Sequence, residues 1–307
     1  GITLPDGTTR VTYLKPGKRL VRVVNEGYNE FNTTVTAIAG ATEFVIAQLA
    51  PLESKNLLPT EIDYTGQMIL IPAGEFILGN NNYLPNEQIE QKLYLPDYYI
   101  DKYEVTNTQY YRFCQATNRS MPTNPWWDEK YFSNPDMPVV GITWNDANAY
   151  ANWANKRLPS ETEWEKAASW EAKSQRKRIW PWGDNPDPRL VNINTDHPSN
   201  INQYPGGVSS YGVQDMAGNA AEWVDSYYQS YPGNQSADTN YGTTNRVVRG
   251  GSFRSSFEDA RTTRRFYHTP DFKADEVKNR SWLIGFRCAI LANDPRLQDF
   301  FKKRTSK

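Results

Sequence analysis

Side chains that could act as nucleophiles or as ligands for soft metals are scarce in this sequence. It contains two cysteines, Cys114 and Cys288, and two histidines, His197 and His268. A Ser-His-Asp hydrolase would need one of these histidines, and His268 lacks a nucleophile-elbow motif. An iron site held by three histidines cannot be formed from two. The cysteines could form at most one bridge, and we expect buried free thiols instead.

A different chemistry, ligand recognition, is favoured by the segment from Arg249 to Arg287. It is rich in guanidinium groups, hydroxyls and flat rings, a composition typical of recognition surfaces. A long irregular stretch held at both ends is usually a functional surface. The alternatives are a solvated charged face for any single residue and an insertion without function for the whole segment. The candidate ligand-binding residues are Arg254, Ser255, Ser256, Phe257, Arg264, Phe266, Tyr267, His268 and Trp282.

The elements that position this segment can be predicted from its two ends and from three helix caps. Residues 246–249 have the pattern of a strand, and Gly250-Gly251 permits the positive φ of a sharp kink. Helices are predicted after Thr106, after Thr143 and after Ser160. Beyond residue 169 the abundance of Gly, Pro, Asn and Tyr indicates mostly loop with short strands.

Composition excludes several classes of partner. The chain has 307 residues, with 34 Lys+Arg against 35 Asp+Glu, so bulk charge gives no reason to expect nucleic acid. No apolar run reaches the length of a membrane span, so we expect no direct membrane insertion. The sequence begins in the middle of a strand-like residue pattern, so we expect it to be a fragment of a longer protein. We favour an extracytoplasmic or membrane-tethered location for that protein. Aromatic residues make up 13% of the chain, which predicts a core built largely of rings.

The N-terminal part is predicted to be a small all-β module covering residues 1–52. Short strands are expected at 11–14, 20–24, 34–38 and 43–47, separated by Pro-Gly, Glu-Gly and Ala-Gly turns. Leu14-Lys15-Pro16-Gly17 and the residues up to Tyr28 resemble the latter half of a PEGA module. The first strand of such a module is missing, so we expect a truncated copy. A linker at 53–66, a second domain at 67–292 and a charged peripheral tail at 293–307 would follow.

The second domain resembles the sulfatase-modifying-factor family, whose best-known member is the formylglycine-generating enzyme. The resemblance runs from Met68 to Ile290 and rests on several ordered sequence blocks. It implies an α+β, C-type-lectin-like fold, in which one or two helices pack on a twisted antiparallel sheet and much of the chain is loop. The matching blocks lie at 69–76, 99–107, 157–165, 181–183, 211–223, 249–253 and 285–287.

The resemblance also implies which metals to expect. Ser255 and Ala260 occupy the positions of the two copper-binding cysteines, and neither can replace a thiolate. Relatives that use iron hold it with histidines, which are too few here. We therefore expect no copper or iron and no catalysis. A structural calcium is expected at Asn219 and Glu222, with the alternative that Asn219 caps the turn and Glu222 pairs with an arginine.

The same family spacing applies to two arginines and one cysteine. Arg261 and Arg265 are expected to form structural ion pairs beneath the 249–287 segment. Some relatives form a cystine at the position of Cys288, but its partner position is Ala151 here, so we expect a buried thiol. A second family calcium site could correspond to Asn192 and Asp196, but the intervening segment is short, and we do not predict calcium there.

Three functions from different classes remain open. The first is a non-catalytic binding domain of a larger kinase-linked or surface protein, which recognises an unknown protein or small molecule through the 249–287 segment. The second is a variable ligand-binding protein diversified by a retroelement, because such proteins carry Gly-Gly-Ser and Gly-Phe-Arg at the same places. The third is an enzyme of unrecognised oxidative chemistry in the same cleft. We favour the first.

Overall fold

The computed structural model describes residues 2–3, 9–10, 17–23, 31–37, 58–272 and 283–305. The chain divides into two compact units, residues 1–58 and residues 59–307, and each is described by itself. No helix in the described ranges is long and apolar enough to cross a membrane.

The N-terminal unit contains two antiparallel strand pairs. The larger is the hairpin of β3 (Gly17–Val23) and β4 (Phe31–Ala37), in which Gly17 lies opposite Ala37. The smaller pairs β1 (Ile2–Thr3) with β2 (Thr9–Arg10). The predicted strands at 20–24 and 34–38 overlap β3 and β4, which confirms them. Those predicted at 11–14 and 43–47 lie outside the described residues.

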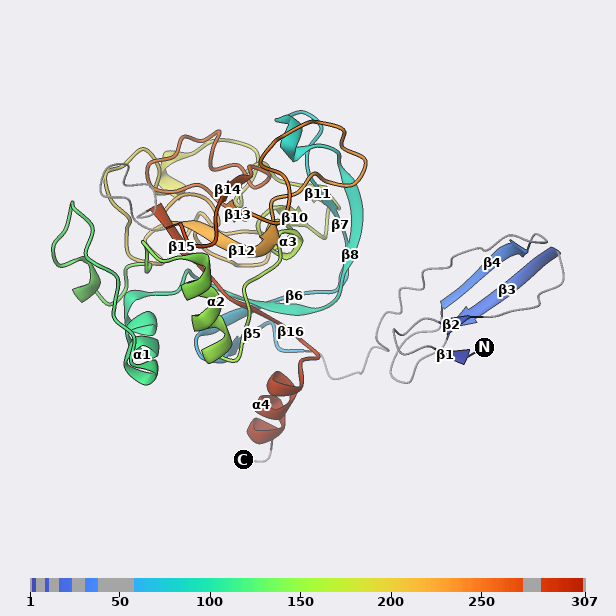
Figure 1. The fold of residues 1–307 in the computed structure, drawn as a ribbon, viewed down its shortest axis with the longest axis horizontal. Coiled ribbons are helices and arrows are strands. Elements are labelled where there is room, and N and C mark those ends of the chain that lie inside the picture. Colours follow the sequence, from blue (N-terminus) through green and yellow to red (C-terminus); the bar gives the residue numbers. More distant parts are fainter. Residues whose placement is uncertain are drawn as a thin grey trace. The chain divides into compact units, whose positions relative to one another are not determined.

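The C-terminal unit is built on two four-stranded sheets and a long hairpin (Figure 1). One sheet has the order β14-β13-β12-β15, and β12 pairs antiparallel with β13 but parallel with β15. The other has the order β16-β9-β6-β5 and is antiparallel throughout. The first sheet is therefore mixed, whereas a purely antiparallel arrangement was expected. Its strands are β12 (Ala221–Tyr227), β13 (Arg246–Arg249), β14 (Phe266–His268) and β15 (Ile284–Phe286).

The remaining strands of this unit are short. The second sheet consists of β5 (Glu61–Asp63), β6 (Gln67–Ile71), β9 (Tyr98–Asp101) and β16 (Ala289–Leu291). Two hairpins stand apart from the sheets: β7 (Gly74–Leu78) with β8 (Gln91–Leu95), and β10 (Trp170–Glu171) with β11 (Arg176–Lys177). Single turns of 3₁₀-helix occur at η1 (Pro85–Glu87), η2 (Tyr131–Ser133) and η3 (Pro188–Leu190).

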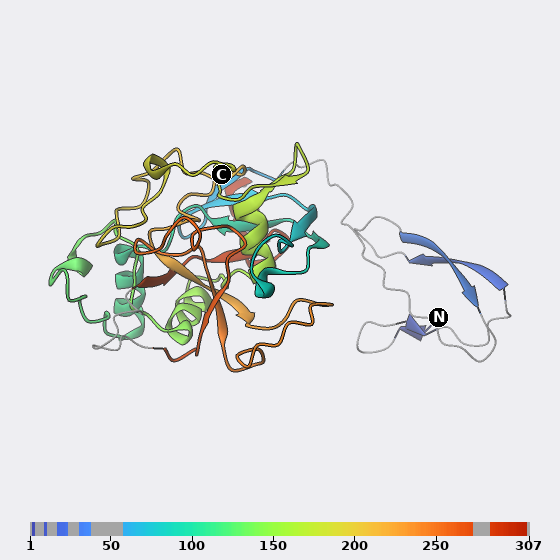
Figure 2. The same cartoon turned by 90° about the horizontal axis from the view of Figure 1, so that it is seen from above.

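The three predicted helices all form, and each begins where its cap was expected. Thr106 caps α1 (Asn107–Thr117) and Ser160 caps α3 (Glu161–Ser169), both through reciprocal capping boxes. Thr143 caps α2 (Trp144–Trp153) by accepting a hydrogen bond from the backbone N–H of Asp146. Figures 1 and 2 both show α1 and α2 side by side. Their buried faces pack with residues of β12 and β15 in one aromatic-rich core cluster, whereas α3 packs with β6 and β9 in another.

Two predicted boundaries need correction. The segment 53–66 is not all linker, because β5 pairs with β6 inside the C-terminal unit. The segment 293–307 is not only a charged tail, because it forms helix α4 (Pro295–Thr305). Leu297 of α4 is fully buried, and Phe300 packs edge-on against Tyr64 with ring centroids 5.1 Å apart. The many basic residues of this segment masked, at the sequence level, the apolar face with which α4 packs against the rest of the unit.

Candidate functional site

The segment after β13 leaves the sheet through a turn that requires glycine. Gly250 and Gly251 have φ values of +88° and +69°, which side chains rarely adopt. A Cβ at Gly250 would lie 3.2 Å from the Trp164 ring, and one at Gly251 would lie 3.0 Å from the carbonyl oxygen of Asp259. The turn therefore presses the start of the loop against α3 and against its own later part. This confirms the predicted kink.

Arg249, immediately before this turn, forms ion pairs and hydrogen bonds that connect three parts of the unit. Its side chain is fully buried and pairs with Glu165 at 2.6 Å and with Glu161 at 3.3 Å, both on α3. It also donates to the backbone carbonyls of Thr262 and Thr263, at 2.7 and 3.0 Å. One guanidinium thus joins the end of β13, one face of α3 and the far side of the loop.

Arg261 and Arg265 continue this frame and confirm the predicted structural ion pairs. Arg261 binds Glu87 through two nitrogens, at 2.8 and 3.0 Å, and Arg265 binds Glu161 at 2.7 and 2.9 Å. Both arginines are buried. Glu87 belongs to η1 at the tip of the β7–β8 hairpin, so the hairpin tip is fixed to the base of the loop. We call Arg249, Arg261, Arg265 and their carboxylate partners Glu87, Glu161 and Glu165 the arginine frame.

The outer part of the loop carries the exposed groups. Arg254 is exposed, and its guanidinium carbon lies 5.4 Å from the ring centre of Trp126. Ser256 donates to Asp259, which also accepts from Arg264, so these three side chains form a chain across the loop. We define the recognition patch as Trp126, Arg254, Ser255, Ser256, Phe257 and Arg264.

Trp126 was not predicted, yet among the described residues it is the most exposed large apolar residue, at 59%. It comes from the connection between α1 and α2. The neighbouring ring of Trp127 packs against Phe253 with centroids 5.5 Å apart, which brings this connection to the loop. The adjacent tryptophans in a polar loop were the available signal, but nothing in their spacing indicated which surface they would meet.

Three of the predicted ligand-binding residues belong to a strand rather than to the exposed surface. Phe266, Tyr267 and His268 form β14, which pairs with β13. Tyr267 stacks on Tyr228 at 4.4 Å, and His268 stacks on Phe272 at 4.1 Å. Their rings are half-buried because they support the edge of the sheet. Trp282 lies outside the described residues.

Phe257 has an intermediate position. It stays in the recognition patch, but its ring contacts Trp180 edge-on at 5.6 Å, and Trp180 is stacked with Trp182. Its side chain is half-buried against the small cluster that contains Ala260. We therefore expect Phe257 to contribute to stability as well as to the surface.

The residues predicted to bind calcium face other partners. Both carboxylate oxygens of Glu222 accept from Arg287, at 2.7 and 2.8 Å, and one also accepts from the indole N–H of Trp164 at 2.7 Å. Asn219 donates to Glu104 at 2.9 Å, while its oxygen accepts from Asn192 and Ser199. The two side chains therefore do not fit a cation held between them. The predicted alternative, Glu222 paired with an arginine, matches the observed contacts.

Within the described ranges, no three His, Cys, Asp or Glu side chains are placed to hold a metal ion. Asn192 hydrogen-bonds Thr195 and Asn219, which leaves it inside the turn network. Cys114 and Cys288 are both buried free thiols, as expected for Cys288.

The surroundings of Glu222 hold more carboxylates than cations. Glu104, Asp215 and Glu222 are all buried near Arg287, whose side chain is fully enclosed. Burial, together with the charges of Asp215 and Glu222, raises the pKa of Glu104 well above its usual range. Burial also raises the pKa of Asp215 to about 6, although Arg287 opposes this shift. Folding therefore disfavours the charged forms of Glu104 and Asp215.

This charge excess predicts that Asp215→Asn stabilises the protein at neutral pH. Because the folded-state pKa is raised, Asp215 costs stability as pH rises from about 4 to about 6, and the full cost remains above that window. At about 1.4 kcal/mol per pKa unit, we expect a gain of about 1–3 kcal/mol at pH 8 and none near pH 4. Urea unfolding of both proteins across this range measures the difference. A variant that is less stable at pH 8 would contradict the carboxylate excess.

One mixed and one antiparallel sheet, few helices, a Gly-Gly turn into a long loop and a frame of buried arginines define an α+β domain of the formylglycine-generating-enzyme-like fold. Residues 54–292 match the sulfatase-modifying factor enzyme 1-like domain, and the chain belongs to this family. The resemblance found from the sequence blocks is thereby confirmed at the level of family and fold.

The names of relatives in this family describe different activities. Hercynine oxygenase of Mycolicibacterium smegmatis is 32% identical over 61% of this chain and 54% of its own length. Serine/threonine-protein kinase Pkn1 of Chlamydia trachomatis is 31% identical over 81% of this chain and 42% of its own length. The chain thus spans about half the length of these curated relatives. The solved structure of Treponema denticola variable protein 1 is similar in fold, with a TM-score of 0.57, 20% identity and coverage of 76% of this chain and 100% of that one.

Proposed function

We propose that this chain is a non-catalytic recognition domain whose recognition patch binds a ligand. The observation that carries the proposal is the exposed Arg254 guanidinium beside the exposed Trp126 ring, on a loop whose base is fixed by buried ion pairs. Arginine and tryptophan are enriched among the residues that dominate binding energy. Because the base is fixed, the loop loses little conformational entropy when a ligand binds.

The patch favours a ligand with a flat or apolar group and an oxygen acceptor. The first would pack on the Trp126 ring, and the second would accept hydrogen bonds from Arg254. Such a ligand can be a segment of a protein or a small molecule. The balanced charge of the chain gives no support to nucleic acid as the partner.

The side chains at the family's catalytic positions support the absence of catalysis. Ser255 replaces a copper-binding cysteine, and its hydroxyl accepts from the backbone N–H of Ser252 at 2.9 Å. Ala260 replaces the other and is fully buried beside Val191 and Ile193. Histidine ligands for iron would have to come from His197 and His268, and the ring of His268 is stacked on Phe272. These donors fit neither copper nor iron.

We further propose that the domain is the ligand-binding part of a longer, kinase-linked or surface protein. Its match to under half of a serine/threonine-protein kinase supports the kinase-linked form. We place such a protein outside the cytoplasm or tethered to a membrane, so that the patch meets external ligands. Locating the full-length protein by cell fractionation with a patch-directed antibody tests this placement.

Two other functions are retained because a specific relative favours each. A variable binding protein diversified by a retroelement is favoured by the likeness to Treponema denticola variable protein 1, which extends to the fold alone. A near-duplicate of the coding sequence for the loop, next to a reverse transcriptase, would establish it. An oxidative enzyme is favoured by the identity with hercynine oxygenase. Stoichiometric copper or iron in the purified protein, with turnover, would establish that function.

The proposed patch predicts a binding defect that is separate from stability. On peptide and glycan arrays, Arg254→Ala and Trp126→Ala are each expected to reduce the binding signal at least about tenfold, the effect of about 1.4 kcal/mol. Their melting temperatures should stay close to that of the parent protein, because both side chains are exposed.

Matched controls come from exposed residues elsewhere in the same unit. Arg296→Ala removes an exposed arginine at the start of α4, and Tyr111→Ala removes a ring that is 52% exposed on α1. Both should bind as the parent protein does. Full binding by the Arg254 and Trp126 variants, or an equal loss in the controls, would exclude the patch as the binding surface.

A further inference from the structure

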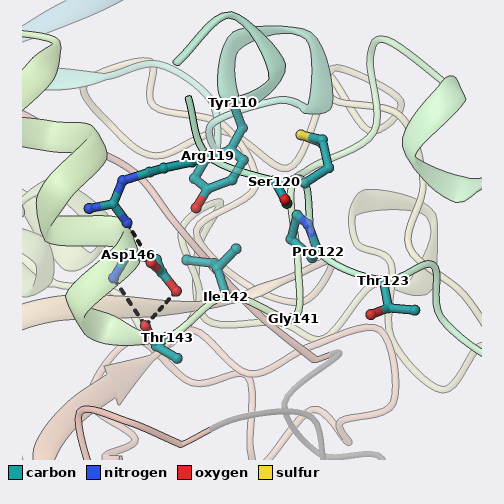
Figure 3. Close-up of a pocket in the computed structure, with 10 residues that line it drawn as sticks. Tyr110, Arg119, Ser120, Pro122, Thr123, Gly141, Ile142, Thr143 and Asp146 are labelled. Carbon is teal, nitrogen blue, oxygen red and sulfur yellow. Dashed lines mark hydrogen bonds and ion pairs between the residues drawn. The ribbon is translucent and has the colours of Figure 1, made fainter. Parts of the chain in front are cut away.

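A cavity of about 400 Å³ opens beside the C-terminal end of α1 and the start of α2 (Figure 3). It is separate from the recognition patch, because no residue of the patch lines it. Its volume falls in the usual range for small-molecule sites. The side chains that matter for its chemistry are Tyr110, Arg119, Met121, Pro122, Ile142 and Asp146.

Tyr110 gives this cavity an unpaired hydroxyl. Its side chain is only 3% exposed, and its ring is held by Phe113, Tyr150 and Phe286 at centroid distances of 5.3, 5.8 and 6.3 Å. Figure 3 shows the hydroxyl directed toward Ile142, which also lines the cavity, and it forms no hydrogen bond with any described residue. The fixed ring therefore places a hydroxyl that can bond to whatever fills the space.

Two buried tyrosines of the same unit, Tyr98 and Tyr131, show a different arrangement. The hydroxyl of Tyr98 donates to the carbonyl of Glu163 at 2.6 Å, and that of Tyr131 donates to the carbonyl of Pro138 at 2.7 Å. Both are fully enclosed and satisfied by the protein itself. The hydroxyl of Tyr110 differs because the cavity, rather than a carbonyl group, lies in front of it.

One wall of the cavity carries a pair of opposite charges. Arg119 donates to one oxygen of Asp146 at 3.1 Å, and Thr143 donates to the other at 2.8 Å. The Arg119 guanidinium carbon also lies 5.5 Å from the ring centre of Phe113, which orients it. A guanidinium has five donors and a carboxylate has about four acceptor sites, so each group retains capacity for a ligand. The pair is partly exposed, at 47% and 38% of the side chains, and can therefore be reached.

Part of the remaining lining is apolar, and Ser120 and Thr123 add hydroxyl groups to it. Met121, Pro122 and Ile142 line the space next to the Tyr110 ring, so one end of a ligand would be removed from water. The charged wall has no net charge, and a ligand of one sign would be attracted by one member of the pair and repelled by the other. A ligand that carries both signs close together can satisfy Arg119 and Asp146 at once.

We propose that this cavity binds a small zwitterion with an apolar side chain, of the free α-amino-acid class. Its carboxylate would bind Arg119, its ammonium group would bind Asp146, and its side chain would pack on Met121, Pro122 and Ile142. The Tyr110 hydroxyl would donate to the ligand carboxylate. This site does not depend on the recognition patch, so either can exist without the other.

The test uses isothermal titration calorimetry with L-leucine, L-methionine and L-phenylalanine up to about 10 mM, a range that detects dissociation constants near 1 mM. At least one should bind. For that amino acid, the N-acetyl derivative, which lacks the ammonium charge, and the amide, which lacks the carboxylate, should each bind at least about tenfold more weakly. Absence of binding by all three, or equal binding of the derivatives, overturns the proposal.

Variants keep the test specific to the cavity. Tyr110→Phe removes only the hydroxyl and preserves the ring packing, and it should weaken binding about five- to tenfold. Tyr111→Phe removes a hydroxyl from the exposed neighbour on the same helix and should bind as the parent does. Binding unchanged in Tyr110→Phe, with the fold intact by its melting curve, would show that the amino acid binds elsewhere and would overturn the assignment.

Discussion

Arg249→Ala is expected to lower the free energy of unfolding by about 3–5 kcal/mol, the usual cost of breaking a buried ion pair from one side. The variant removes the cation that Glu165 meets at 2.6 Å and the donors that the carbonyls of Thr262 and Thr263 accept from. Lys177 and Arg265 remain near the two glutamates, so the charges are not wholly unpaired. Urea denaturation followed by tryptophan fluorescence measures the loss.

The control for this result is an arginine five positions along the same loop. Arg254→Ala should change the free energy of unfolding by less than about 0.5 kcal/mol, because its side chain is exposed. The pair of variants therefore separates the arginine frame from the recognition patch without any ligand. Similar large losses in both would mean that Arg254 is part of the packed structure, and the patch would lose its central residue.

Arg287→Ala is expected to have an effect of similar size for a different reason. Arg287 is the fully buried cation facing Glu222, and it also donates to the carbonyls of Asp101, Lys102 and Gln214. Removing it leaves Glu222 beside Glu104 and Asp215 without compensation, which should cost about 3–5 kcal/mol or prevent folding at neutral pH.

Acid pH provides the diagnostic for Arg287. The loss should be smaller near pH 5 than at pH 8, because protonated carboxyl groups no longer need the cation. The double variant Arg287→Met with Glu222→Gln should be more stable than Arg287→Ala alone, and a double-mutant cycle gives the coupling. A loss that does not change with pH would point to packing, rather than charge, as the role of Arg287.

Much of the fold could be predicted because its signals are local. The helix caps at Thr106, Thr143 and Ser160 depend on residues within one turn, and all three helices begin there. The kink at Gly250-Gly251 follows from glycine alone. The parallel pairing of β12 with β15 was missed, because it joins segments separated by the whole loop. Neither strand carries a local sequence signal for its partner.

The candidate site was predicted only in part, and the errors have physical causes. An aromatic residue in an irregular segment can face solvent or support a sheet edge, and sequence composition is the same in both cases. Tyr267 supports the edge, whereas Arg254 faces solvent. Trp126 was missed because it reaches the loop from a distant part of the chain. Calcium was expected at Glu222 from the family resemblance, and the sequence could not show which arginine pairs with it, because Arg287 is 65 residues away.

The placement of β13 and β15 on either side of β12 has a consequence for changes in loop length. Both ends of the intervening segment are fixed by hydrogen bonds to one central strand, and Arg261 and Arg265 fix it again partway along. Lengthening a loop whose ends are already fixed adds only about 0.6 kcal/mol for each doubling. Foreign peptides inserted directly after the exposed Arg254 should therefore be tolerated better than the same insertion across Arg261, which would remove an anchor. The domain could in this way serve as a display scaffold.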